Sequence, residues 1–138
     1  MAFPLGTLYH GTKFAVEGLS ESVYYELGAL GIRVKIVEPG GTTTDFGGRS
    51  LDFSNDTELK EYQPLVQKVL DVLGPMMANG SAPERIAEVI YSAATDGTDR
   101  LRYEAGADAV QMLVVRRSTD DAGFLAGMRA RFGLGGHQ

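Results

Sequence analysis

The stretch YHGTKFAVEGLSESVYYELGALGIRVKIVEPG, residues 9–40, combines a helix pattern with a strand pattern and decides the fold. Along residues 9–30, apolar side chains recur at spacings of three and four and form one stripe, which consists of Val16, Leu19, Val23, Leu27 and Leu30. This periodicity is typical of an amphipathic helix. Gly31 follows the last residue of the stripe, and the helix is therefore predicted to end there.

A strand is predicted directly after this helix. Over residues 32–38, apolar side chains alternate with charged ones, and this period of two is typical of a strand. Pro39 and Gly40 end the pattern, because proline and glycine favour turns. A loop rich in glycine and hydroxyl groups is expected over residues 41–50.

Helical periodicity dominates the rest of the chain. It predicts a partly helical segment over about 55–73, in which Pro64 breaks or starts a helical piece, and a helix that ends at Asp96-Gly97. It also predicts helices over about 107–116 and 121–131, and a second short strand over 100–106. Gly74-Pro75 predicts the end of the first of these helices. Ser81 and Glu84 have the spacing of a capping box, which predicts the start of the second. Strands separated by helices pair in parallel, so the predicted fold class is α/β.

The composition limits the classes of partner and cofactor. A net charge of −5 argues against nucleic acid and anionic membranes as partners, because both attract basic surfaces. The chain has no cysteine, which excludes disulfides, a thiol nucleophile and thiolate metal sites. With two histidines, an imidazole-rich metal centre is excluded as well.

The length of 138 residues fits a single domain over 1–138. The first residues lack the basic and apolar regions of a signal peptide, and no apolar run approaches the roughly 20 residues of a membrane helix. We therefore expect a cytoplasmic protein. The glycine-rich end predicts a disordered tail over residues 132–138.

Tyr9 and Lys13 form the candidate catalytic pair. Their spacing of four residues places the two side chains on one face of a helix. An ammonium close to a phenol favours the phenolate and lowers the tyrosine pKa, so that the phenol can exchange a proton with a carbonyl or an alcohol. The remaining donors of the lysine can bind sugar hydroxyls. The alternative interpretation is an ordinary pair on a solvated helix surface.

Several motifs, in the same order and spacing, resemble the short-chain dehydrogenase/reductase family. They are Tyr9-x-x-x-Lys13, the GIRV segment at 31–34, Pro39-Gly40 with Thr44 after it, and the segments SAPERIAEVIYSAATDG and RLRYEAGADA. The resemblance covers about residues 1–110. It implies the C-terminal part of a doubly wound, Rossmann-type parallel sheet and a nicotinamide dinucleotide, NAD or NADP, as cofactor.

The resemblance also implies roles for individual residues. Tyr9 is the expected acid/base, and Lys13 is expected to bind the nicotinamide ribose and to lower the pKa of Tyr9. Pro39, Gly40 and the backbone near Thr42 are expected to line the nicotinamide. Thr44 is expected to reach the carboxamide or the phosphates.

Two parts of the family pattern are expected to lie before Met1. One is the glycine-rich loop that binds pyrophosphate at a helix start, and the other is the catalytic serine, about a dozen residues before the tyrosine. The N-terminal dinucleotide-binding half is thus expected to be missing. Weak or no cofactor binding is expected of this chain alone.

The family resemblance makes residues 45–80 a variable substrate loop. Four of its apolar side chains are candidates for a pocket wall, although each can equally fill the core: Phe46, Leu51, Phe53 and Tyr62.

Two kinds of function remain open at this point. The first is an oxidoreductase that moves hydride between NAD(P)H and a carbonyl or alcohol. The second is a catalytically inactive oligomeric interaction module, or one half of a split enzyme. Self-association is expected through the helix at 9–31, and an N-terminal half supplied in trans is the alternative partner.

Overall fold

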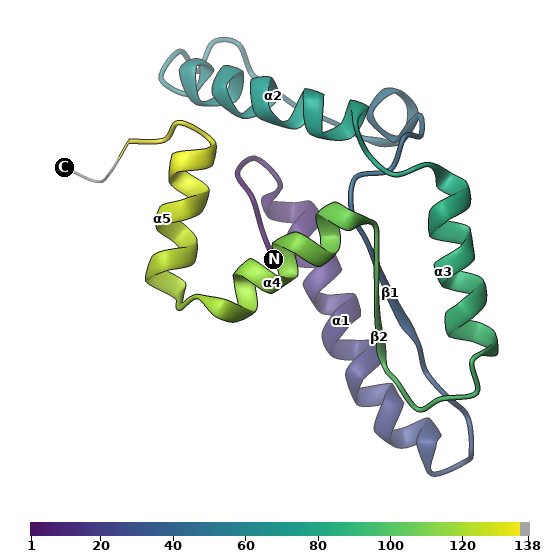
Figure 1. Cartoon of the computed structure of the whole chain (residues 1–138). Coiled ribbons are helices and arrows are strands. Elements are labelled where there is room, and N and C mark those ends of the chain that lie inside the picture. The colour runs from purple at the N-terminus through teal and green to yellow at the C-terminus, as the bar shows by residue number, and fades with distance from the viewer. Residues whose placement is uncertain (136–138) are drawn as a thin grey trace.

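The computed structural model describes residues 1–135 and is shown in Figure 1. Its elements in chain order are α1 (Thr7–Gly28), β1 (Ile36–Pro39), the π-helical turn η1 (Phe46–Ser50), α2 (Gln63–Ala78), α3 (Pro83–Thr95), β2 (Arg102–Ala105), α4 (Ala107–Ser118) and α5 (Asp121–Arg131). The predicted α/β class is confirmed. No helix within the described part of the chain is both long enough and apolar enough to cross a membrane.

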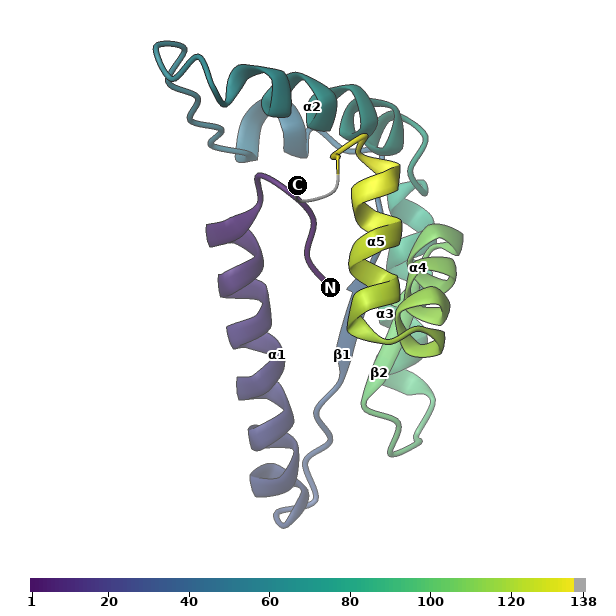
Figure 2. The ribbon, with the colours of Figure 1, turned by 90° about the vertical axis from the view of Figure 1, so that its left-hand side faces the viewer.

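The two strands form a parallel sheet in which Ile36 lies beside Arg102 and Glu38 beside Glu104. In Figures 1 and 2 this sheet lies between α1 on one side and α3 on the other. The last ladder bond continues past the strand, because the Gly40 amide donates to the Ala105 carbonyl at 2.9 Å. The loops after β1 and β2 therefore begin at the same edge of the sheet.

The first strand is shorter than predicted, because it begins at Ile36 instead of Ile32. The first ladder bond runs from the Ile36 amide to the Leu101 carbonyl at 2.7 Å. Upstream of that bond the neighbouring segment is a loop. Its carbonyls at Thr98 and Arg100 accept hydrogen bonds from the Lys35 ammonium instead of from a strand. The alternating pattern of residues 32–38 thus includes residues 32–35, which have no neighbouring strand to pair with.

The second helix begins where Pro64 was predicted to break or start a helical piece, but the predicted end at Gly74-Pro75 was wrong. α2 begins at Gln63 with Pro64 in its first turn, where the missing amide costs nothing. It then continues through Gly74-Pro75 and ends at Ala78. Asn79 closes the last turn, since both its backbone amide and its side-chain amide donate to the Pro75 carbonyl. These two hydrogen bonds stabilise the last turn of α2, which lies beyond the Gly74-Pro75 stop signal.

The predicted capping box at Ser81 and Glu84 does not form. The N-cap of α3 is Ala82, and no side chain caps the helix. Ser81 is instead part of a bridge to the loop after β1: its amide donates to the Gly41 carbonyl at 2.8 Å, and its carbonyl accepts from the Thr43 amide at 2.9 Å. A tertiary contact has replaced the local one.

The core is small and lies around the sheet. Its buried apolar residues are Ile36, Val66, Val69, Ala93, Tyr103, Ala105, Ala109 and Phe132. The apolar stripe of α1 contributes little to it, since Val16, Leu19 and Leu30 are all more than half exposed.

Phe132 is the first residue of the predicted C-terminal tail, yet its side chain is buried. The Lys68 ammonium donates to the Gly133 carbonyl at 2.9 Å, and the Leu134 amide donates to the Arg129 carbonyl. These contacts tie residues 132–134 to α2 and α5. The remainder of the predicted tail, residues 136–138, lies outside the described residues.

Candidate functional site

Tyr9 and Lys13 lie together at the start of α1, as their spacing predicts. The Lys13 Nζ atom is 5.3 Å from the centre of the Tyr9 ring, which is cation–π distance. Both side chains are exposed, Tyr9 by 42%. A phenol with a neighbouring ammonium is therefore accessible to a reacting molecule.

His10, beside this pair, was not predicted to matter and is the single buried polar residue of α1. Its Nε2 atom accepts a hydrogen bond from the Phe3 amide at 3.3 Å, and the Phe3 ring packs edge-on against the imidazole. Burial, followed by the positive charge of the Met1 amino group, lowers the pKa of His10. The neutral imidazole thus holds residues 1–6 against the first turns of α1.

The predicted cofactor-binding residues after β1 form one connected loop. Pro39 ends the strand, and the Gly40 amide continues the ladder to Ala105. The Thr42 hydroxyl donates to the Gly40 carbonyl at 3.3 Å, and the Thr44 amide donates to the Thr42 carbonyl at 2.8 Å.

Phe46, two residues after Thr44, is an aromatic neighbour of the candidate pair Tyr9 and Lys13. Its ring centre lies 6.1 Å from that of Tyr9. In the described residues no hydrogen bond joins Tyr9 or Lys13 to Pro39, Gly40, Thr42 or Thr44. Phe46, the first residue of η1 and one of the predicted pocket-wall residues, thus lies near Tyr9.

A shallow hollow of about 410 Å³ opens beside the loop. It is lined by residues from the loop, from η1 and from the end of α2: Thr43, Thr44, Asp45, Gly47, Gly48, Met77 and Ala78. Hydroxyl and backbone groups of this kind suit the carboxamide and ribose end of a nicotinamide. Of the predicted cofactor-binding residues, Thr44 is the one that lines this hollow.

The pyrophosphate end finds no matching site among residues 1–135. The one direct strand-to-helix turn in that range runs from β2 through Gly106 to α4, where backbone amides can bind phosphate. The carboxylate of Asp108 occupies this turn, and its charge repels a phosphate.

Asp108 was missed by the sequence analysis. Its Oδ2 atom accepts a hydrogen bond from the Gly41 amide at 2.7 Å, although the two residues are 67 positions apart. An acidic residue in the first turn of a helix is a common local signal for the helix dipole. That signal gives no indication of a distant partner.

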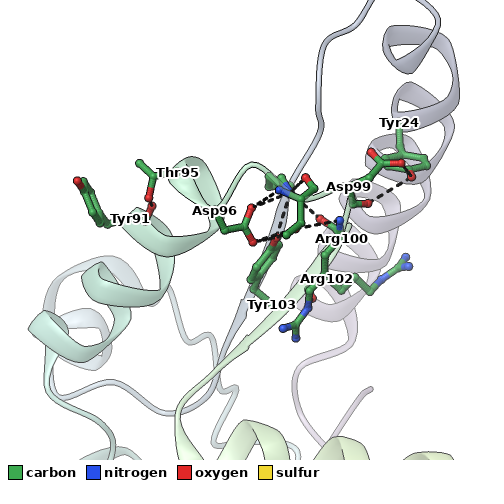
Figure 3. Close-up of polar contacts among 10 residues, drawn as sticks. Tyr24, Tyr91, Thr95, Asp96, Asp99, Arg100, Arg102 and Tyr103 are labelled. Atoms are coloured by element: carbon green, nitrogen blue, oxygen red, sulfur yellow. Dashed lines mark hydrogen bonds and ion pairs between the residues drawn. The ribbon is translucent and has the colours of Figure 1, made fainter.

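A second polar cluster lies at the opposite ends of the strands (Figure 3). The buried Tyr103 hydroxyl donates to Asp96 Oδ2 at 2.5 Å, and Lys35 forms an ion pair with the same carboxylate at 3.5 Å. The hydrogen bond from Tyr103, with that from the Thr98 amide, holds the pKa of Asp96 well below its usual range. With its hydroxyl committed and its ring buried, Tyr103 has a structural role.

Among the described residues, no three His, Asp or Glu side chains come close enough to hold a metal ion.

Known proteins resemble this chain in sequence. Residues 1–54 match the family model of short chain dehydrogenase. An uncharacterized oxidoreductase of Schizosaccharomyces pombe is 44% identical over 134 residues, which are 97% of this chain and 56% of that protein. An uncharacterized oxidoreductase of Bacillus subtilis is 32% identical over 107 residues, covering 75% of this chain and 38% of that protein. A 3-ketodihydrosphingosine reductase of Bacteroides thetaiotaomicron is 28% identical over 120 residues, covering 84% and 43%.

The chain thus spans between 38% and 56% of the length of these relatives. The family match covers Tyr9, Lys13 and the loop after β1, and the alignment with the Schizosaccharomyces pombe protein extends over nearly the whole chain. The parallel two-stranded sheet agrees with part of a Rossmann-type fold. The chain belongs to the short-chain dehydrogenase/reductase family.

Proposed function

We propose that this chain supplies the proton-transfer residues of an NAD(P)-dependent oxidoreductase that interconverts a carbonyl and an alcohol. The observation that carries the proposal is the exposed Tyr9 phenol with the Lys13 ammonium 5.3 Å from its ring. The relatives support the reaction class, because they are named as oxidoreductases and one is named as a reductase of a 3-keto compound.

The proposed roles are those that the family resemblance implies for each group. The Tyr9 hydroxyl donates a proton to the carbonyl oxygen in reduction and accepts one from the alcohol in oxidation. The Lys13 ammonium stabilises the phenolate that forms in reduction and binds ribose hydroxyls. Nicotinamide, when bound, supplies or takes up the hydride. The loop from Pro39 to Thr44 is proposed to contact the nicotinamide ring and its carboxamide.

The experiment compares Tyr9→Phe and Lys13→Met with Tyr25→Phe in the natural protein that contains this chain. Tyr25 is a matched control, because it is an exposed tyrosine of the same helix. Tyr9→Phe is expected to lower kcat by about 10²–10⁴-fold with an unchanged Kd for NAD(P)H. Lys13→Met is expected to lower kcat and to weaken NAD(P)H binding. An active Tyr9→Phe variant would contradict the proposal.

A second candidate function, an oligomeric interaction module, is favoured by the exposure of α1 and by the sheet. Phe14, Val16 and Leu19 are each more than half exposed, and among the described residues β1 pairs on one edge only, with β2. Apolar surface and an unpaired strand edge both favour association. The partner is a second copy bound through residues 9–31 or a dinucleotide-binding half in trans.

Light scattering, which measures the mass of the particle in solution, tests whether the chain associates with itself. A self-associating chain is expected to give at least twice the monomer mass, and Leu19→Lys is expected to reduce it. A stable, folded monomer that gains NAD(P)H binding on addition of a dinucleotide-binding half supports the split enzyme. A stable monomer without such a gain contradicts the interaction module.

A further inference from the structure

Asp108 connects two segments that meet at the carboxyl edge of the sheet. It lies in the first turn of α4, directly after β2, and its Oδ2 atom accepts the Gly41 amide at 2.7 Å. No side chain caps α4, so this carboxylate is committed to the loop and not to an amide of its own helix. An interaction of Asp108 with the dipole of α4 alone does not explain why its carboxylate accepts a hydrogen bond from Gly41.

The packing around the carboxylate is close on both sides, at Gly40 and at Gly106. A Cβ atom at Gly40 would overlap the Asp108 carboxylate, and a Cβ at Gly106 would lie 2.8 Å from Oδ1. Gly106 also has a φ of 106°, which disfavours other residues. The carboxylate therefore fills the space that side chains at Gly40 and Gly106 would occupy.

The remaining backbone groups of the loop are anchored elsewhere. Gly40 donates to Ala105, while the Gly41 carbonyl and the Thr43 amide both pair with Ser81. The Gly41 amide is the donor that Asp108 satisfies. This hydrogen bond fixes the peptide plane between Gly40 and Gly41, and with it the direction of the Gly40 carbonyl that accepts the Thr42 hydroxyl.

We propose that Asp108 is a positioning residue, which sets the backbone of residues 40–42 in the orientation that contacts the nicotinamide end of the cofactor. The inference rests on the proposed function of the loop. It assigns to α4 an indirect part in cofactor binding, because Asp108 contacts the loop and not the cofactor. Removing the acceptor frees the Gly40–Gly41 peptide plane and weakens cofactor binding without changing the proton-transfer groups.

The experiment uses Asp108→Ala, Asp108→Asn and the matched control Asp120→Ala. Asp120 accepts from the Gly123 amide at 2.8 Å, so its removal also deletes a carboxylate bonded to a glycine amide, at the start of α5. Hydrogen exchange of the Gly41 amide, measured by NMR on this chain, reports the contact. KM for NAD(P)H and kcat, measured on the natural protein that contains the chain, report its effect.

For Asp108→Ala we expect about tenfold faster exchange at Gly41, as for the loss of one charge-assisted hydrogen bond. We also expect about a tenfold higher KM for NAD(P)H with kcat within about twofold. Asp108→Asn retains a carbonyl acceptor and is expected to restore most of both values. Asp120→Ala is expected to change neither.

The possible failures are distinguishable. Unchanged exchange at Gly41 in Asp108→Ala overturns the contact itself. Faster exchange with an unchanged KM overturns the positioning role and leaves the proposed function intact. If the natural wild-type protein binds no NAD(P)H, the proposed function fails, and the role of Asp108 towards the cofactor fails with it.

Discussion

The Arg102 guanidinium on β2 donates to the Glu21 carboxylate on α1 at 2.6 Å and to Glu17, one turn earlier, at 3.2 Å. These two ion pairs hold α1 against the sheet, together with the Tyr24 hydroxyl, which donates to Asp99 at 2.8 Å. α1 carries the candidate pair Tyr9 and Lys13 at its start, in the turns before Glu17 and Glu21.

Arg102→Met is therefore expected to release α1. The free energy of unfolding should fall by about 1 kcal/mol, since the pairs are partly exposed. Amide exchange over residues 7–28 should rise more than exchange in α3. Arg85→Met is the control, because it removes an exposed pair with Glu88 inside α3. Equal exchange in α1 of both variants would contradict this account of how the helix is attached.

The burial of His10 predicts a loss of stability in mild acid. Its pKa in the folded state is lower than in the unfolded chain, where it is 6.5. The neutral form is therefore stabilised by folding, and this stabilisation is lost as pH falls below about 6.5. Tm should drop by a few degrees between pH 7.5 and 5.5, and His10→Gln should remove most of that slope. The same pH slope in the variant would exclude His10 as its cause.

Glu38 is expected to destabilise the folded chain at neutral pH. Burial and the nearby Glu17 carboxylate raise its pKa, partly opposed by Arg102, and its Oε2 atom is buried without a hydrogen-bond partner. Because the folded pKa is raised above 4.5, the native state loses stability as pH rises through it.

Glu38→Gln should therefore raise the free energy of unfolding at pH 7 by roughly 0.5–1 kcal/mol, with no gain at pH 4. Urea titration at the two pH values measures the difference. Glu58→Gln is the control, since the Glu58 side chain is 83% exposed. If Glu38→Gln raised the free energy of unfolding equally at both pH values, the gain would come from packing and not from the loss of the buried charge.

Gly40 should not tolerate a side chain. Gly40→Ala places a methyl group into the Asp108 carboxylate, and we expect a loss of about 1–3 kcal/mol in the free energy of unfolding. Gly18→Ala is the matched control, because its Cβ meets nothing within 4 Å in the interior of α1. That change should stabilise by about 0.5–1 kcal/mol. Equal effects of the two changes would refute the close packing at Gly40.

The sequence predicted those features that depend on short spacings. Tyr9 and Lys13 meet because they are one helical turn apart, and the parallel pairing of the strands follows from the helices between them. Tertiary contacts account for the errors. Ser81 donates to the Gly41 carbonyl instead of capping α3, and Asp108 accepts from the Gly41 amide, 67 residues away. Neither pairing leaves a periodic signal in one chain.

The hydrogen bond between Tyr103 and Asp96 also gives the protein an internal optical reporter. The chain has six tyrosines and no tryptophan, so phenol rings alone produce its near-ultraviolet emission. A phenol that donates to an ionised carboxylate is quenched, because the acceptor takes up the proton in the excited state. The emission of Tyr103 is therefore expected to be weak in the native chain and to increase when the sheet comes apart.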